Sequence, residues 1–247
     1  MSYAGNKRNE CKDLYDMIDF NNCKTFIEPY AGSCAVSYYT WLKNPNLNFI
    51  LNDENKYLKD MFIILKDEDK IDKFHNDYKE LVKDMNKEQY NIICKTDNTV
   101  SWFIKNKVYQ IRPGLFQMEE KRVKKEINLR EYPIYNFFKN ANIDFRTGNG
   151  VLLLEEYKNN KEAVIFLDPP YINTSNQFYN YNIENVKYSN IYEYLYHNDI
   201  NFFESCIFGI FEDNWVIRLL FTNKIKHLYD KTYQTSKKKT NHLIISN

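Results

Sequence analysis

The chain has 247 residues, of which 43% are hydrophobic, so it can bury one core and still accommodate an inserted subdomain. Its formal net charge of +1 excludes proteins that coat nucleic acid through charge alone, so a polyanionic partner would have to meet a local basic strip. No apolar run is long enough to cross a membrane, and the residues after Met1 are polar, so we expect neither membrane insertion nor secretion.

The first predicted elements are a strand, a helix and a second strand. Residues 25–27 form a short apolar run that stops at a turn containing proline and glycine, residues 28–33. A helical pattern covers residues 35–43, and residues 48–51 form a second apolar run that ends at Asn52-Asp53. Runs of this length and ending are typical of parallel strands that are covered on both faces.

The region from about residue 56 to residue 140 has a different character. It is charged, rich in lysine and helical in pattern, and it contains the turn Arg112-Pro113-Gly114 and a basic run at residues 121–125. We predict that this region is inserted between the second strand and the later strands of the sheet. Residues 61–140 then form a helical insertion, and residues 1–60 and 141–247 form the main domain.

Beyond the insertion the alternation of helix and strand resumes. The pattern predicts a helix at residues 151–158, a strand at 163–167, a loop over 173–196, a strand at 215–220, a helix near 224–228 and a final strand at 242–246. Such alternation indicates an α/β fold with a parallel sheet, whose ligands bind beyond the carboxyl ends of the strands. Three acidic turns lie at such ends, at Glu28, Asp53 and Asp168.

The turn Asp168-Pro169-Pro170-Tyr171 carries the clearest chemical signal. Its prolines fix the backbone and remove two N–H donors, so the carbonyls can accept hydrogen bonds from a ligand. A carboxylate beside a carbonyl suits an exocyclic amine with two hydrogens, and Tyr171 offers a ring on which a base can stack. Accepting both hydrogens favours a pyramidal nitrogen whose lone pair faces a methyl donor held in line. A structural Pro-Pro turn is the alternative.

Two further features point to a nucleoside cofactor. Residues 28–34 place Ala-Gly-Ser between a strand and a helix, which lets a ligand approach the backbone N–H groups. This turn lacks the spacing of a dinucleotide or phosphate loop, so a carboxylate-bearing ligand suits it as well as a phosphate. Asp53 ends the second strand about 20 residues later, where an acid can bind both ribose hydroxyls. A helix N-cap is the alternative role for Asp53.

Together these motifs resemble the D12 class, or Dam-type, of N6-adenine DNA methyltransferases. Residues 3–7 are similar to that family's amino-terminal W/Y-x-G-x-K motif, residues 26–33 to F-x-E-P-x-x-G-S, and residues 168–171 to its catalytic DPPY motif. Asp53 corresponds to the ribose-binding acid, and residues 228–229 and 243–247 are similar to the family's closing strand pair. Five features in the family's order are far more specific than any single one.

The resemblance implies a fold and a reaction. The fold would be the Rossmann-like one of S-adenosylmethionine-dependent methyltransferases, with a mostly parallel sheet, a C-terminal antiparallel strand pair and a helical insertion that recognises the target. The enzyme would transfer a methyl group from S-adenosylmethionine to N6 of an adenine flipped out of DNA, which we expect to be double-stranded. It would act inside the cell, in the cytoplasm or wherever its DNA resides, and no metal is implied.

The resemblance also implies a set of site residues. Asp168, Pro169, Pro170 and Tyr171 would be catalytic, with Asp168 and the Pro169 carbonyl holding the amine while Tyr171 stacks on the base. Lys7 would lie near the catalytic carboxylate. The cofactor pocket would comprise Tyr3, Gly5, Lys7, Glu28, Pro29, Tyr30, Gly32, Asp53, Asn149 and Asp168.

Three positions depart from the family's pattern. Cys34 stands where a third small glycine is usual, and we expect it to crowd the pocket. Asn6 replaces a common glycine. Asn149 follows a strand whose end often carries an acid near the cofactor's adenine, and its amide can still exchange hydrogen bonds with that ring.

Weaker sequence signals indicate candidate DNA contacts, and the spacing of cysteines and histidines argues against a metal site. A basic run neutralises phosphates or forms a solvated helix face, and a loop arginine reads a guanine edge or supports its own loop. The candidates are Arg112, Lys121, Arg122, Lys124, Lys125 and Tyr179. We assign Lys237–Lys239 to an exposed turn. The five cysteines and four histidines show no ligand spacing, so we expect reduced thiols and no bound metal.

Two other functions stay open at this point. One is methylation of a different amine, in RNA adenine, in cytosine N4 or in a glutamine amide; an aspartate before the two prolines favours adenine. The other is a relic that binds cofactor or DNA without turnover, against which the intact Lys7, Asp53, Asp168 and Tyr171 argue. The sequence carries no signal for an oligomeric state.

Overall fold

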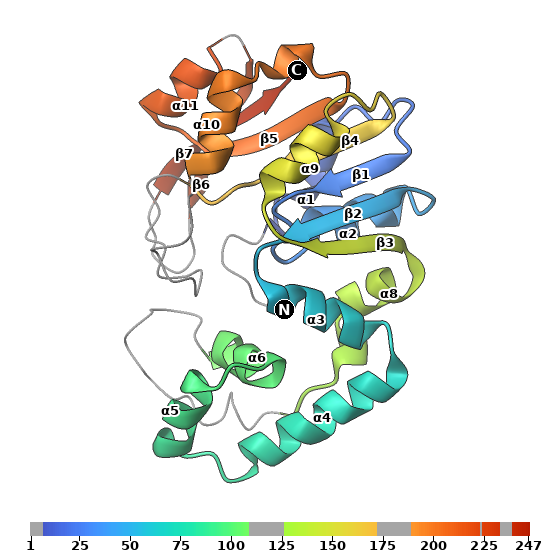
Figure 1. Cartoon of the computed structure of the whole chain (residues 1–247), viewed down its shortest axis with the longest axis vertical. Helices are drawn as coiled ribbons and strands as arrows, with labels where there is room; N and C mark the ends of the chain where they lie inside the picture. Colours follow the sequence, from blue (N-terminus) through green and yellow to red (C-terminus); the bar gives the residue numbers. More distant parts are fainter. Residues whose placement is uncertain (1–6, 109–125, 172–188, 223, 233–238) are drawn as a thin grey trace.

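The computed structural model describes residues 7–108, 126–171, 189–222, 224–232 and 239–247. Within them a seven-stranded sheet carries helices on both faces, and a helical lobe lies beyond the β3 edge (Figure 1). The strand order is β3-β2-β1-β4-β5-β7-β6, and neighbours are parallel except that β7 is antiparallel to β5 and β6. The strands are β1 (Thr25–Glu28), β2 (Asn48–Asp53), β3 (Asn142–Thr147), β4 (Ala163–Leu167), β5 (Cys206–Glu212), β6 (Ile225–Thr232) and β7 (Lys239–Ser246).

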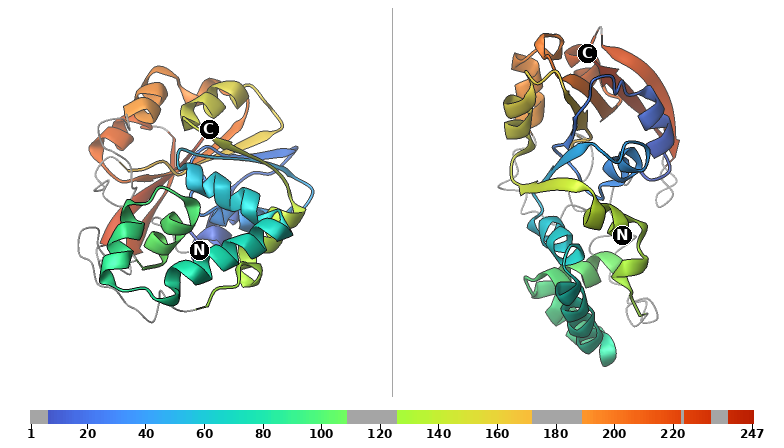
Figure 2. Two further views of the ribbon diagram at one scale, coloured as in Figure 1. Left: turned by 60° about the horizontal axis from the view of Figure 1, so that its bottom comes forward. Right: turned by 90° about the vertical axis from the view of Figure 1, so that its right-hand side faces the viewer.

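Two groups of helices cover the sheet, and a third group forms the lobe (Figure 2). One face carries α1 (Cys11–Met17), α2 (Ala35–Lys43), α3 (Lys56–Leu65) and α8 (Pro133–Asn140). The other face carries α9 (Gly150–Tyr157), α10 (Ser189–His197), η3 (Ile200–Phe202) and α11 (Trp215–Leu220). The lobe contains α4 (Glu68–Lys83), α5 (Lys87–Lys95) and α6 (Thr99–Val108), with η1 (Leu129–Glu131) close by.

The central strands are buried on both faces because successive side chains point to opposite sides of the sheet. Phe26 and Phe166 belong to the hydrophobic cluster beneath α1, α2 and α3. Their neighbours Ile27 and Ile165 belong to the cluster beneath α9 and α10. This alternation explains why apolar runs without a polar face form β1 and β4.

The lobe shares its core with the sheet. The cluster that contains Phe49 of β2 continues through Phe62 of α3 to Phe74 of α4 and Trp102 of α6. Residue 61, where we place the start of the insertion, lies within α3. The lobe is therefore packed onto the main domain, and its assignment to target recognition stays a prediction.

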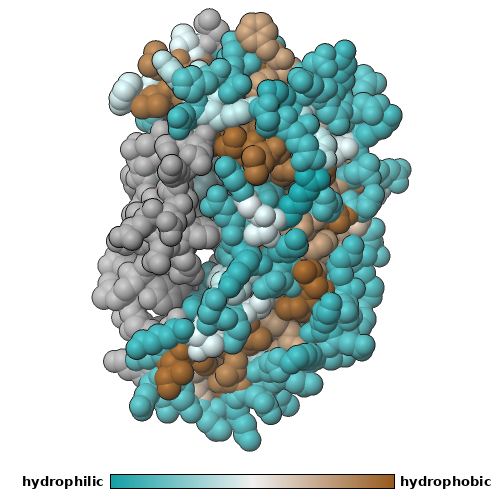
Figure 3. Space-filling model, in the orientation of Figure 1, coloured by the Kyte–Doolittle hydropathy of each residue, from teal (hydrophilic) through white to brown (hydrophobic). Residues whose placement is uncertain are grey.

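Side-chain caps explain where the helices of this region begin. The side chains of Asn55, Asp67 and Asn86 each accept a backbone N–H at the start of α3, α4 and α5, at 3.1, 3.2 and 2.9 Å. Such caps satisfy N–H groups that the first turn of a helix leaves unpaired. Hydrophilic residues cover most of the face in Figure 3, as expected of a chain with 34 basic and 33 acidic residues. None of the described helices is long and apolar enough to cross a bilayer.

The predicted fold class is confirmed. The sheet is mostly parallel, ends in an antiparallel C-terminal pair and carries a helical insertion between β2 and β3. The helix predicted at 35–43 and the strand predicted at 163–167 have the bounds of α2 and β4. The predicted closing pair forms as well, since Leu228 of β6 is in register with Leu243 of β7.

Two predictions near the C-terminus are wrong. Residues 215–220 form α11 instead of a strand, because Asn214 caps the segment through the N–H of Ile217 at 3.0 Å and only Ile217 is fully buried. Residues 224–228 do not form a helix, since β6 begins at Ile225 and pairs with β7. Periodicity alone does not separate helix from strand in apolar runs this short, so caps and pairing partners decide.

The loop predicted over residues 173–196 is corrected in part. Residues 172–188 lie outside the described residues, whereas residues 189–197 form α10. Ile191, Tyr192 and Leu195 bury one face of that helix against the sheet. Its aromatic, polar composition concealed the helical spacing. The central strand β5 was not predicted, since Gly209 interrupts its apolar run.

Candidate active site

The candidate site lies at the carboxyl ends of β1, β2 and β4, where three acidic turns meet. The order β3-β2-β1-β4 places these ends side by side at one edge of the sheet. Ligands of open parallel sheets bind at this edge. Residues that are far apart in the chain therefore lie together at this site. Lys7, in the segment that precedes α1, contacts Asp168.

The carboxylate of Asp168 has a partner on each oxygen. Lys7 Nζ donates to Oδ2 in an ion pair, and the hydroxyl of Tyr171 donates to Oδ1 at 3.1 Å. The side chains of Lys7 and Asp168 are only 4% and 18% exposed, so water screens this pair less than it would screen a surface pair. The Lys7 ammonium also lies 5.7 Å from the centroid of the Tyr171 ring.

Tyr171 is buried and packs against His242 of β7. The two ring centroids are 5.0 Å apart at an interplanar angle of 79°, and Nδ1 of His242 lies 3.5 Å from the tyrosine hydroxyl. When that hydroxyl donates to Asp168, the imidazole can contribute only as an N–H donor. The pairing of β7 with β5 brings His242 close to Tyr171, so no local sequence pattern marks this histidine.

The second proline of the turn is held from the other face of the sheet. The hydroxyl of Tyr192, on α10, donates to the carbonyl of Pro170 at 2.9 Å. This carbonyl is therefore already engaged by the protein. The Pro169 carbonyl is the one that we assigned to the target amine.

Glu28 ends β1 and lies in the interior, with only 3% of its surface exposed. Ser37 Oγ of α2 donates to its Oε2 at 2.7 Å. Burial raises the pKa of the Glu28 carboxyl to about 8, although the hydrogen bond from Ser37 opposes this rise; the negative charge of Asp168 adds a smaller increase. At neutral pH this carboxyl is therefore mostly protonated.

The sequence model of the D12 class N6 adenine-specific DNA methyltransferases matches residues 3–243 of the chain. The chain belongs to this family. It is therefore a methyltransferase of the Rossmann-like α/β class that acts on N6 of adenine in DNA and needs a methyl donor. No curated protein matches the chain.

The structure places Asp53 of this D12-class methyltransferase beside the glycine turn. Asp53 Oδ2 accepts the N–H of Gly32 at 2.9 Å, and Oδ1 accepts the N–H of Asn55 at 2.9 Å. Asn55, whose side chain accepts the N–H of Tyr57, is the residue that caps α3. Asp53 is thus oriented at the edge of the sheet, and its binding to ribose stays a prediction.

Tyr30 lies against Gly150 at the start of α9, next to Asn149 in the chain. The side chain of Asn149 caps this helix by accepting the N–H of Val151 at 3.0 Å. A Cβ on Gly150 would lie 2.8 Å from both the Pro29 carbonyl and the Tyr30 ring, so only glycine fits there. Tyr30 therefore packs across the turn after β3. The assignment of Asn149 to the cofactor's adenine stays a prediction.

Several predicted site residues lie outside the described residues. Among the cofactor residues these are Tyr3 and Gly5, and among the DNA contacts Arg112, Lys121, Arg122, Lys124, Lys125 and Tyr179. The residues that sequence analysis missed are Ser37, Asn52, Tyr192 and His242. No local motif marks any of them, because each acts through a contact with another element of the fold.

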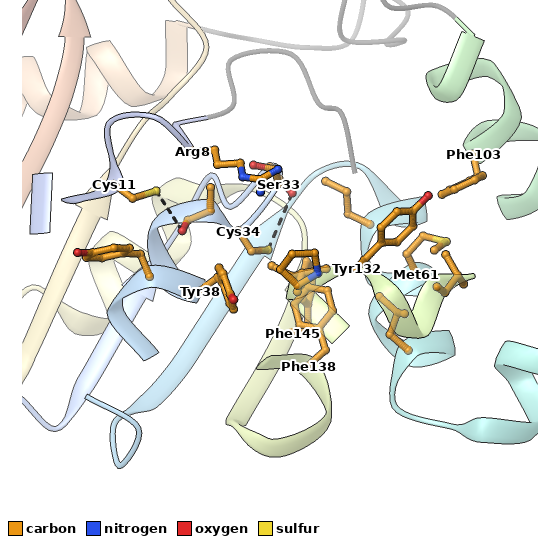
Figure 4. Close-up of a pocket in the computed structure, with 18 residues that line it drawn as sticks. Arg8, Cys11, Ser33, Cys34, Tyr38, Met61, Phe103, Tyr132, Phe138 and Phe145 are labelled. Atoms are coloured by element: carbon orange, nitrogen blue, oxygen red, sulfur yellow. Dashed lines mark hydrogen bonds between the residues drawn. The ribbon is translucent and has the colours of Figure 1, made fainter. Parts of the chain in front are cut away.

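Cys34 adopts the left-handed conformation that favours glycine, with φ of 55° and ψ of 30°. Its side chain is buried, and burial raises the pKa of its thiol, so the thiol stays protonated and weakly nucleophilic. With Gly32 and Ser33 it lines one side of a cavity of about 350 Å³, whose other side carries aromatic residues such as Phe103 and Phe138 (Figure 4). The departure at Cys34 is thus accompanied by an unfavourable backbone conformation.

We expect Cys34→Gly to be more stable than Cys34→Ala by about 1 kcal/mol, because glycine relieves the left-handed strain while alanine retains it. Chemical denaturation of both variants measures the difference. At Cys23, whose φ is not positive, the same two substitutions should rank the other way. Equal stability of the two Cys34 variants would contradict the argument from strain.

The raised pKa of Glu28 predicts how stability depends on pH. The unfolded carboxyl has its ordinary pKa of 4.5, whereas in the folded protein the pKa is about 8. The contribution of Glu28 to the free energy of unfolding is therefore fully present below about pH 4.5 and is lost as pH rises through about 8. The Glu28→Gln variant keeps a partner for Ser37 but does not titrate. Relative to it, the free energy of unfolding of the wild-type protein should fall by on the order of a few kcal/mol across this pH range. Urea denaturation at several pH values tests this, and parallel pH profiles of the two proteins would refute it.

Proposed function

We propose that this D12-class enzyme takes its methyl group from S-adenosylmethionine and methylates an adenine flipped out of double-stranded DNA into the Asp168–Tyr171 turn. The observation that carries the proposal is the buried ion pair between Lys7 and Asp168 at the carboxyl end of β4, beside the turns after β1 and β2. A partly buried carboxylate held by a cation and a phenol is suited to accept hydrogen bonds from an amine.

The residues of the pocket fit the proposed cofactor. When bound, S-adenosylmethionine supplies an electrophilic methyl group on a positively charged sulfur. Asp53 is oriented by two backbone N–H groups, and a carboxylate is a residue type suited to accept hydrogen bonds from ribose hydroxyls. Gly32, with φ of 48°, allows close approach to the backbone. Glu28, Pro29 and Tyr30 would flank the methionine end.

The contacts of Asp168 suggest how the target amine is received. Each oxygen already accepts one hydrogen bond, and we infer that the incoming amine displaces one of the two partners. The Tyr171 hydroxyl is the weaker partner, since it is neutral and lies at 3.1 Å. Lys7 then stays on Oδ2 and holds the carboxylate in place through their ion pair. Tyr171, once released, is available to stack on the base, and the Pro169 carbonyl accepts the second amine hydrogen.

Transfer of a tritiated methyl group tests the proposal. Duplex DNA without prior methylation should be labelled, and nucleoside digestion should recover the label in N6-methyladenine. Matched RNA and protein acceptors should stay unlabelled. Label in RNA or in cytosine would redirect the proposal to another amine. Cofactor binding with no transfer to any acceptor would indicate an inactive relative.

A further inference from the structure

We propose that Asn52 is a positioning residue of the cofactor pocket, which fixes the turns after β1 and β3 relative to each other through one side-chain amide. The inference rests on the proposed function, since it concerns how that pocket is held in shape. Asn52 is the penultimate residue of β2, and only 3% of its surface is exposed. No sequence motif drew attention to it beyond its place before Asp53.

The amide nitrogen of Asn52 makes two hydrogen bonds, one to each of the turns on either side of the end of β2. Nδ2 donates to the Pro29 carbonyl at 2.9 Å and to the Gly148 carbonyl at 2.9 Å. Pro29 belongs to the turn after β1 and Gly148 to the turn after β3, while β2 lies between those strands. A primary amide is the uncharged side-chain group that offers two hydrogens on a single atom, so the residue type matches the task.

The backbone around Asn52 completes this arrangement. The Asn52 carbonyl accepts the N–H of Ala31 at 2.8 Å, and the neighbouring Asp53 carboxylate accepts the N–H of Gly32 at 2.9 Å. The turn after β1 is thus hydrogen-bonded to the end of β2 at three points, Pro29, Ala31 and Gly32. These bonds hold the turn in place, and the turn carries residues that we assigned to the cofactor pocket. The bonds therefore help to set the positions of those residues.

The close approach at Gly150 shows why the separation of the two turns matters. The Pro29 carbonyl and the Tyr30 ring lie within 2.8 Å of the position that a Cβ on Gly150 would occupy. Asn52 bridges the same two turns from within the protein. Loss of the bridge would leave one buried and one partly buried carbonyl without this donor and would let Tyr30 shift relative to Asn149.

Asn52→Asp is the sharpest change, because it keeps the shape and replaces both donated hydrogens with an acceptor that faces two carbonyls. Asn48→Asp is the matched control, since Asn48 is exposed and starts the same strand, at the end remote from the candidate site. We expect Asn52→Asp to weaken the binding of S-adenosylmethionine about 30-fold or more, measured by calorimetry on folded protein. Asn48→Asp should leave affinity within about twofold.

Two readouts separate positioning from general stability. Hydrogen exchange without ligand should show faster exchange at the amides of Ala31 and Gly32 in Asn52→Asp but not in Asn48→Asp. The KM for S-adenosylmethionine should rise more than kcat falls, because Asn52 does not touch the reacting atoms. Should Asn52→Asp not fold, Asn52→Ser, with one hydroxyl donor, should weaken binding about tenfold.

The outcomes are distinct for the two proposals. Unchanged affinity and unchanged exchange in the folded Asn52 variants overturn the role of Asn52 and leave the proposed function intact. Wild-type protein that fails to bind S-adenosylmethionine overturns the proposed function and the cofactor role of Asn52 with it. Weakened affinity with faster exchange at Ala31 and Gly32 supports both.

Discussion

Asp168→Ala should lower methyl transfer by about a thousandfold or more while cofactor affinity changes by less than about tenfold. The carboxylate faces the target amine in the proposed mechanism, so its loss removes the acceptor that orients the nitrogen lone pair. Single-turnover methyl transfer and calorimetry with S-adenosylmethionine measure the two effects separately. Normal turnover in this variant would show that the amine is not held by Asp168.

A control is needed because Asp168→Ala leaves Lys7 buried without its carboxylate. Breaking one side of a buried ion pair costs about 3–5 kcal/mol, so the single variant should also be less stable. The double variant Lys7→Met, Asp168→Ala removes both charges and should recover most of that stability. It should stay inactive, which separates loss of chemistry from loss of folding. Recovery of activity in the double variant would contradict the mechanism.

Asp53→Ala should weaken S-adenosylmethionine binding about 30- to 100-fold, because a carboxylate that accepts two hydroxyls contributes charge-assisted hydrogen bonds worth about 1.5–3 kcal/mol each, reduced by the competing water. Equilibrium calorimetry measures the affinity directly. The affinity of Asp53→Asn should fall between those of the wild-type protein and Asp53→Ala, since asparagine keeps one acceptor oxygen for the N–H of Gly32 or Asn55.

The matched control for Asp53 is Asp67→Ala at the start of α4. Asp67 also accepts a backbone N–H, from Lys70 at 3.2 Å, but it lies in the helical lobe. Its removal should cost about 1 kcal/mol of stability and leave cofactor affinity unchanged. If both variants weakened binding equally, the effect at Asp53 would come from stability and not from contact with ribose.

Much of the site was predictable because its motifs are local. The Asp168 turn, the turn after Glu28 and Asp53 each follow a short apolar strand, and strand ends of a parallel sheet meet at one edge. Their order along the chain was enough to recognise the family, which the match over residues 3–243 confirms. Their individual roles stay predictions.

The rest of the site depends on neighbours that come from distant segments. His242 reaches Tyr171 through the pairing of β7 with β5, and Tyr192 reaches Pro170 from a helix that we took for a loop. Burial keeps Glu28 mostly protonated at neutral pH, a consequence of packing that no residue pattern records.

By itself, the sequence determined the α/β class, the family and the motifs at the ends of β1, β2 and β4, because apolar runs, prolines and glycines act on the chain locally. Only the tertiary structure decided that residues 215–220 form a helix, that Asn52 bridges Pro29 and Gly148, and that Lys7 and Tyr171 share Asp168. The physical reason is that hydrogen bonds, burial and ion pairing between segments remote in the chain are set by the register of the sheet and the packing of its faces.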